Sequence, residues 1–110
     1  MTTFSKRSPA ITVDNRTDAD KANTALFVVT LDKFMSGWGG APGRSYFAVP
    51  CASLEQAKIV QANMRHRSEM TRVRLRWASQ RIVSLRHGDH LSIRAMDDCE
   101  RFYTPGGFAS

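Results

Sequence analysis

Residues 25–31 form an unbroken run of apolar and β-branched side chains, with the sequence ALFVVTL. A short run of aliphatic, aromatic and β-branched residues is typical of a buried β-strand. A glycine-rich segment at 32–43 follows, and the strand pattern resumes at 45–49 until Pro50 ends it. This part of the chain therefore predicts two strands that are joined by a loop.

A helix pattern follows the second strand. Ser53 and Gln56 form a capping box, in which the serine side chain accepts from the third helical N–H and the glutamine reaches back. Apolar side chains then recur at helical spacing, namely Leu54, Ala57, Ile59, Val60 and Met64. We expect this helix to end near residue 67 or 68.

The rest of the chain predicts further strands. Residues 71–77 alternate strictly between basic or polar and apolar side chains, which is the period of a strand. Residues 82–85 and 91–96 flank a polar segment that contains Gly88, which predicts a β-hairpin, and 101–103 suggest another short strand. The order β-β-α-β-β-β predicts an α+β fold, with an antiparallel sheet of about four to five strands and one helix packed on one face.

One domain accounts for the chain length. The 110 residues, of which 42% are hydrophobic, are enough for one core and too few for two. Residues 1–24 are polar and carry charges of both signs, so we expect an N-terminal arm in which only Ile11 and Val13 suggest a short strand. Residues 25–110 form the single α+β domain of this prediction.

The basic charge is concentrated in one part of the sequence. Sixteen Lys plus Arg oppose ten Asp plus Glu, which gives a formal net charge of +6. Residues 65–94 alone hold eight arginines against Glu69 and Asp89, and the charges of the other segments cancel. Arginine suits bidentate contacts with phosphate or carboxylate groups. The balance excludes an acidic DNA mimic and favours an anionic partner.

Three of these arginines share one face of the expected strand at 71–77. Strand residues two apart point the same way and lie about 6.6 Å apart, so Arg72, Arg74 and Arg76 form a row. Successive phosphates of a nucleic-acid strand are separated by a similar distance. Other arginines could extend this candidate surface, namely Arg65, Arg67, Arg81, Arg86 and Arg94. The alternative is a solvated strand face whose charge discourages edge pairing.

Trp38, in the glycine-rich loop, is a further candidate contact residue. An exposed tryptophan can stack on a base or anchor an interface. The alternative is that it packs with Phe34 and Met35 as the apolar anchor of its own loop. The loop glycines have neither the P-loop spacing nor a GxGxxG pattern, so we expect no nucleotide cradle there.

The residues with catalytic or ligand chemistry lack the spacing of a known site. His87, Asp89 and His90 are metal-ligand types, but polar turn chemistry is the favoured interpretation. The acidic cluster at 97–100 could hold Mg²⁺, although it also balances nearby basic charge. We therefore expect no metal and no cofactor, and we favour a non-enzymatic protein. A metal-dependent enzyme is kept as an alternative.

The sequence also bears on the compartment. It has no stretch near the roughly 18 apolar residues of a membrane span, and no apolar block follows the basic N-terminal residues as in a secretory signal. Cys51 and Cys99 are expected as free thiols, since two distant cysteines in a chain with a sufficient core are typical of reduced cytosolic proteins. We expect a cytoplasmic protein without a membrane partner.

Two segments resemble small proteins that phages and other mobile elements encode. These are residues 28–39, VVTLDKFMSGWG, and 55–63, EQAKIVQAN, which Arg65, His66 and Arg67 follow closely. The resembling proteins carry a strand, a DKFMSGWG-type loop, a strand, an EEAxxVxxN-like helix and an Arg-bearing turn, over roughly residues 26–76 here. The resemblance implies an accessory role in a host cell, where small α+β proteins often inhibit defence systems, as anti-CRISPR proteins do.

Two functions follow as expectations. The first is a phage-type accessory protein that binds a host ribonucleoprotein or other nucleic-acid-handling complex, or its nucleic acid, through the arginine face. The second is a direct DNA- or RNA-binding module, such as a regulator or recombination accessory. Both are compatible with a homodimer.

Overall fold

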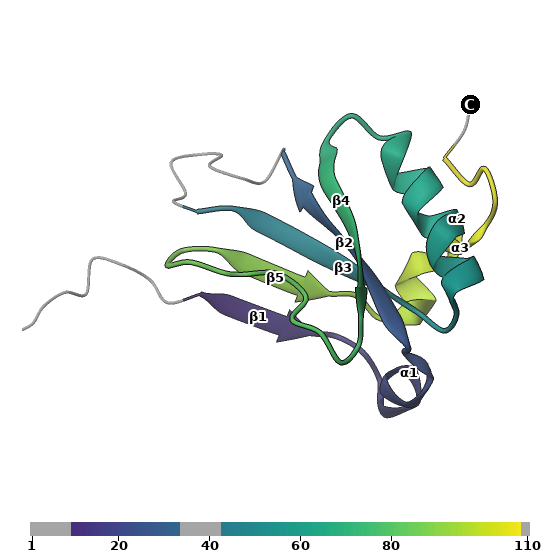
Figure 1. Cartoon of the computed structure of the whole chain (residues 1–110), viewed down its shortest axis with the longest axis horizontal. Coiled ribbons are helices and arrows are strands. Elements are labelled where there is room, and N and C mark those ends of the chain that lie inside the picture. The colour runs from purple at the N-terminus through teal and green to yellow at the C-terminus, as the bar shows by residue number, and fades with distance from the viewer. Residues whose placement is uncertain (1–9, 34–42, 109–110) are drawn as a thin grey trace, which may run out of the picture.

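The computed structural model describes residues 10–33 and 43–108, and Figure 1 shows their arrangement. The strands form one five-stranded sheet in the order β1-β5-β3-β2-β4. Their bounds are β1 Ile11–Asp14, β2 Leu26–Asp32, β3 Ser45–Cys51, β4 Met70–Trp77 and β5 His90–Ile93. The helices are α1 Asp18–Asn23, α2 Leu54–Arg65, the 3₁₀ helix η2 Met96–Cys99 and α3 Glu100–Tyr103. The predicted α+β class, with one long helix on a face of the sheet, is confirmed.

The pairing of the strands is mixed. Strand β2 pairs antiparallel with β3 and with β4, whereas β5 pairs in parallel with β3 and with β1. Strands β4 and β1 are therefore the two edges of the sheet. None of the helices in the described parts of the chain is long and apolar enough to span a membrane.

The sheet is covered on both faces, which explains the unbroken apolar run of β2. Alternate residues of a strand point to opposite faces. Leu26 and Val28 lie in the core under α2, while Phe27 and Val29 lie in a second core on the other face. The second core is covered by Ile82, Val83 and Leu85, which are partly buried against it.

Helix α2 begins as its cap predicts. The Ser53 hydroxyl accepts from the N–H of Gln56 at 3.1 Å, and the Gln56 side chain accepts from the N–H of Ala52 at 2.8 Å. Ala57, Val60, Asn63 and Met64 form its buried face. The helix ends at Arg65, slightly before the predicted residue 67 or 68.

Strand β4 contains a bulge near its start. Pairing with β2 is regular from Arg74 onward and resumes at Thr71 after a shift, so that Arg72 and Val73 together face Thr30 of β2. Arg72 has a φ of 54°, the left-handed conformation that non-glycine residues rarely adopt. The hydroxyl of Thr30 donates to the carbonyl oxygen of Thr71 at 2.8 Å.

The bulge decides which face of the sheet the β4 side chains occupy. Met70 and Val73 both pack against the core under α2, although they are three residues apart. Strict alternation would place them on opposite faces, and the extra residue of the bulge brings them to the same one. Arg74 and Arg76 consequently lie on the face away from α2.

The predicted hairpin at 82–85 and 91–96 is wrong. Residues 82–85 form no strand, and β5 pairs in parallel with β1 and β3. The segment instead packs against the second core and covers its apolar surface with Ile82, Val83 and Leu85. A segment that covers a sheet face needs the same apolar residues as a strand, but it makes no ladder hydrogen bonds.

The predicted strand at 101–103 is also wrong, because these residues belong to helix α3. The buried side-chain amide of Asn63 donates to the carbonyl oxygens of Arg101, Phe102 and Thr104, at 3.3, 2.7 and 2.8 Å. Phe102 packs into the core under α2. The amide thus satisfies carbonyl groups that the end of a helix leaves without partners.

The predicted N-terminal arm takes part in the sheet. Residues 11–14, where the sequence suggested a short strand, form the edge strand β1 beside β5. Helix α1 is an element that the sequence patterns did not predict, and its N-cap Thr17 forms a capping box with Asp20. The Asp20 carboxylate also accepts from the N–H of Met96 at 3.1 Å. These contacts join residues 11–23 to the C-terminal part of the fold.

Candidate anion-binding groove

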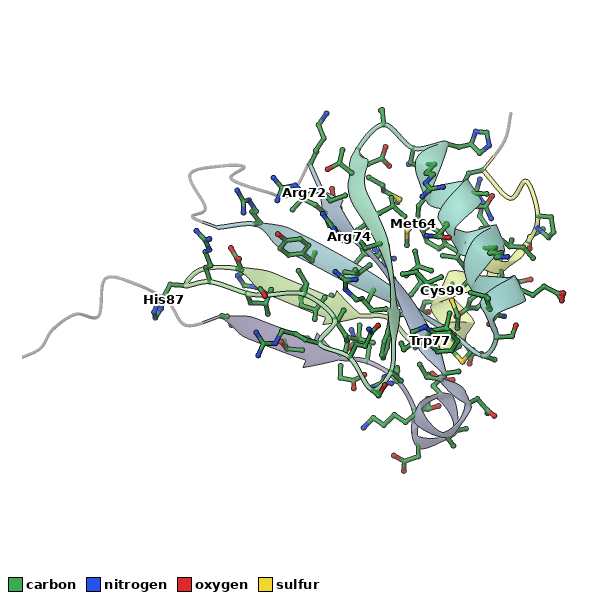
Figure 2. The ribbon with its side chains drawn as sticks, in the orientation of Figure 1. Met64, Arg72, Arg74, Trp77, His87 and Cys99 are labelled. Atoms are coloured by element: carbon green, nitrogen blue, oxygen red, sulfur yellow. The ribbon has the colours of Figure 1, made fainter. Side chains whose placement is uncertain are left out.

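Arginine side chains from three segments meet on the sheet face away from α2. A pocket of about 250 Å³ is lined there by Arg72, Arg74 and Arg76 of β4, by Arg44 before β3, and by Arg86 before β5. The remaining lining residues are Val29, Tyr46, Ile82, Val83 and Ser84, so this pocket of the described chain has no carboxylate lining. Figure 2 shows Arg72 and Arg74 on the side of β4 away from α2. Five guanidinium groups in one hollow create a strongly positive potential.

A second pocket adjoins the first. It has a volume of about 320 Å³ and is lined by Arg76, Gln80, Arg81, Val83 and Ser84. Arg76, Val83 and Ser84 line both pockets, so the two adjoin and form one surface region beside β4. We call it the arginine groove, and define it by Arg44, Arg72, Arg74, Arg76, Arg81 and Arg86.

The groove guanidiniums make no salt bridges among the described residues, although the charge of Asp89 interacts with those of Arg44 and Arg86. The two salt bridges within the described residues lie elsewhere, between Arg16 and Asp14 and between Arg67 and Glu69. None of the six groove guanidiniums makes a hydrogen bond or salt bridge to another described residue. Six arginines against one carboxylate leave an excess of positive charge whose members repel one another, and a bound anion would reduce that repulsion.

The Asp89 carboxylate binds the backbone of two groove arginines. This buried group accepts from the backbone N–H of Arg44 and from that of Arg86, each at 2.9 Å. Burial raises the pKa of Asp89, but the two N–H donors and the charges of Arg86 and Arg44 outweigh it, so the pKa is lowered overall. The predicted polar turn chemistry of Asp89 is therefore observed, because its carboxylate accepts from the backbone N–H groups of Arg44 and Arg86. Among the residues that the structure describes, no cluster of ligand side chains could hold a metal ion.

Two glycines allow this turn to approach β3 closely. Gly43 has a φ of 85°, and a Cβ atom added to it would overlap the carbonyl group of Gly88. Gly88 also has a φ of 85°. Both positions therefore need glycine, the first for space as well as conformation. The close approach brings Arg44 and Arg86 to the same end of the groove.

Tyr46 forms part of the groove floor. The residue is 8% exposed, and it packs with the second core beside Val29. Its hydroxyl makes no hydrogen bond within the described chain, although a buried tyrosine hydroxyl usually has a partner. The floor thus combines apolar side chains with one tyrosine.

The other predicted contact residues lie elsewhere. Arg65 is exposed at the end of α2, and the Arg67 guanidinium lies over the Phe108 ring at 5.1 Å as well as beside Glu69. Arg94 covers the ring of Phe47 at 4.2 Å, on the α2 side of the sheet. Trp38 lies outside the described residues.

Arg44 and Tyr46 are groove residues that sequence reasoning missed. Both lie in the first half of the chain, outside the arginine-rich stretch at 65–94. Arg44 directly follows the glycine segment and Tyr46 lies on an apolar strand, so neither has a local signal of function. Only the pairing of β3 between β2 and β5 brings them to the groove.

The buried cysteines do not supply a nucleophile. Cys51 and Cys99 are free and lie in the core under α2. Burial raises the pKa of the Cys51 thiol to about 12 and that of Cys99 to about 11. A thiol with such a pKa stays protonated at neutral pH and is a poor nucleophile.

Comparison with protein-family models, with curated proteins and with solved structures finds no significant match for this chain.

Proposed function

We propose that this chain is a non-enzymatic nucleic-acid-binding protein that holds the phosphate backbone in the arginine groove. The observation that carries the proposal is the set of six arginines around two adjoining pockets without a lining carboxylate. Guanidinium groups bind phosphate oxygens in a bidentate manner. A phosphate polymer therefore matches both the charge and the donor geometry of the groove.

The extent of the groove favours a polymer over a single phosphate. The arginines are distributed over two adjoining pockets, and Arg74 and Arg76, two residues apart on a strand, are separated by about 6.6 Å along it. A single phosphate group can contact only some of them. A chain with phosphates at a similar spacing can contact them in succession.

The test is fluorescence anisotropy with labelled DNA and RNA oligonucleotides over a range of salt concentrations. We expect affinity to fall steeply with salt, because each neutralised phosphate releases counterions. Reversal of Arg72, Arg74 and Arg76 to Glu should abolish binding. Gln at the three positions should lower the salt slope by about three, because each replaced arginine no longer neutralises its phosphate.

The matched control reverses three exposed basic residues away from the groove. Lys21 and Lys58 lie on α1 and α2, and Arg65 ends α2. The triple Glu variant at these positions has the same net charge as the groove variant, so it separates a local surface from a general charge effect. Equal loss of binding in the two variants, or no binding by the unmodified protein, overturns the proposal.

A second candidate is an accessory protein of a mobile element, acting in the host cytoplasm. The resemblance over residues 26–76 favours it, and the partner would be a nucleic-acid-handling host complex that the protein inhibits. In that case the groove would contact an acidic surface or the nucleic acid bound to the complex. A pull-down from host lysate that survives nuclease and high salt supports this candidate, because shape-complementary protein contacts resist salt better than phosphate contacts.

A further inference from the structure

We infer that the arginine groove accepts a single nucleic-acid strand and excludes a double helix. This inference rests on the proposed function and names its substrate class. Three features of the groove carry it: donors on both of its sides, a small volume, and a floor of apolar side chains with one tyrosine.

Guanidinium groups border the groove on two sides. Arg72, Arg74 and Arg76 belong to β4, whereas Arg81 and Arg86 belong to the segment at 80–86 that crosses the same face of the sheet. A strand that lies between them can be contacted from both sides. A convex duplex resting on the rim would meet mainly the outermost side chains.

The volume of the groove is suited to a few nucleotide units. Its two pockets measure about 250 and 320 Å³, one just below and one just above the lower limit of the roughly 300–1,000 Å³ of small-molecule sites. A double helix is wider than its own major groove, which is about 12 Å across, so it cannot enter such a space. One or two nucleotides of a flexible strand can enter.

The floor offers contacts that only unpaired nucleotides can use. Ile82 and Val83, which are partly exposed, provide apolar surface, and the Tyr46 hydroxyl has no hydrogen-bond partner in the described chain. In a duplex the faces of the bases are stacked inside the helix. In a single strand they are free to cover apolar or aromatic side chains, as in other grooves that bind single strands.

The first experiment compares one labelled oligonucleotide of mixed sequence, as a single strand and annealed to its complement, in DNA and RNA form. We expect the single strand to bind about tenfold more tightly or better, because one base contact contributes about that factor. Duplex binding equal to single-strand binding, and abolished on reversal of Arg72, Arg74 and Arg76, overturns the inference while the proposed function stands. Absence of binding to both probes overturns the two together.

The second experiment fills the groove without changing its charge. Ser84 is exposed and lines both pockets, so Ser84→Trp should obstruct the path of the strand and weaken its binding about tenfold. Ala62→Trp, on the exposed side of α2, is the control and should bind as the unmodified protein does. Unchanged single-strand binding by a folded Ser84→Trp variant overturns the inference.

The third experiment removes the hydroxyl of Tyr46 alone. Tyr46→Phe keeps the ring in the second core, and we expect the affinity for the single strand to fall about threefold to tenfold with unchanged thermal stability, because the hydroxyl has no hydrogen-bond partner among the described residues. An isolated mononucleotide serves as a competitor. If it displaces the strand at equal molar concentration, the groove is a nucleotide pocket and the inference is wrong.

Discussion

The hydroxyl of Thr30 donates a 2.8 Å hydrogen bond to the carbonyl oxygen of Thr71, directly before the bulge at Arg72 and Val73. Thr30 is fully buried on β2. The shift in register interrupts the ladder between β2 and β4 at this point, and the hydroxyl supplies a donor to the bulged strand. The contact therefore supports the part of β4 that places Arg72, Arg74 and Arg76 in the groove.

Replacing Thr30 with Val should destabilise the protein. Valine has nearly the same shape but no hydroxyl, so the Thr71 carbonyl loses its donor in a partly buried setting. The expected cost is about 1–3 kcal/mol of unfolding free energy, measurable by urea denaturation. Thr30→Ser keeps the donor and should lose less. A Val variant as stable as the unmodified protein would show that the bulge does not need this contact.

Arg72 should tolerate glycine better than its neighbour Arg74 does. At Arg72 the left-handed φ of 54° costs a non-glycine residue roughly 1–2 kcal/mol, which glycine recovers, less its own entropic cost of roughly 0.5–1 kcal/mol. Arg72→Gly should therefore be as stable as the unmodified protein or slightly more stable. Arg74→Gly, on regular strand backbone, should lose stability.

The same pair separates stability from binding. Each variant removes one groove arginine, so both should lower the salt slope of oligonucleotide binding by about one. Thermal melting gives the stability difference in the same samples. If Arg72→Gly melts lower than Arg74→Gly, the left-handed backbone at position 72 is not a source of strain.

The sequence predicts the elements whose signals are local. The strands at 26–32 and 45–51 follow from their apolar runs, and α2 follows from its serine cap and apolar stripe. The arginine row follows from alternation, and four of the predicted arginines, Arg72, Arg74, Arg76 and Arg86, share one pocket. Hydrophobic periodicity and helix caps depend on residues that are close in the sequence, so they can be recognised without knowledge of the fold.

The features that escape sequence reasoning depend on distant partners. The bulge depends on how β4 pairs with β2. At Arg72 it changes which face of the sheet the side chains of β4 occupy. Arg44 reaches the groove through the pairing of β3 between β2 and β5, and Asp89, 45 residues away in the sequence, accepts from its N–H. Residues 82–85 have an apolar pattern that suits both a strand and a cover over a sheet, and the position of β5 beside β3 decides between them.

Removing the amide of Asn63 should free the C-terminal helix without affecting the groove. Asn63 is 1% exposed, and its side chain donates to three carbonyl groups in and after α3. Asn63→Leu leaves these acceptors without a donor, so the unfolding free energy should fall by about 2–4 kcal/mol. Urea denaturation followed by circular dichroism measures it.

The groove lies on the other face of the sheet, so binding at low temperature should persist in the folded fraction of this variant. Asn63→Asp is the informative companion, because it keeps the shape but turns the donor into an acceptor facing carbonyl oxygens. It should be at least as destabilising as Leu. Full stability of either variant would contradict the role assigned to the amide.

Asp89→Asn should disturb one end of the groove while the net positive charge rises. The Asp89 carboxylate accepts from the N–H groups of Arg44 and Arg86, and an amide offers only one acceptor oxygen for the two. We expect a loss of about 1–3 kcal/mol in stability and weaker oligonucleotide binding. A general charge effect predicts the opposite change in binding, so titration with a labelled single strand distinguishes positioning from net charge.

The pH dependence gives Asp89 an independent signature. Its pKa is lowered in the folded protein, so its contribution to stability is complete above the unfolded pKa of about 3.9 and is lost as the pH falls through the lower folded pKa. Asp14, Asp20 and Glu69 also have lowered pKa values, so the acid loss is shared. Urea denaturation from neutral pH to about pH 3 should therefore show a shallower decline for Asp89→Asn than for the unmodified protein. Parallel curves for the two proteins would mean that the ionised Asp89 carboxylate does not stabilise the folded protein.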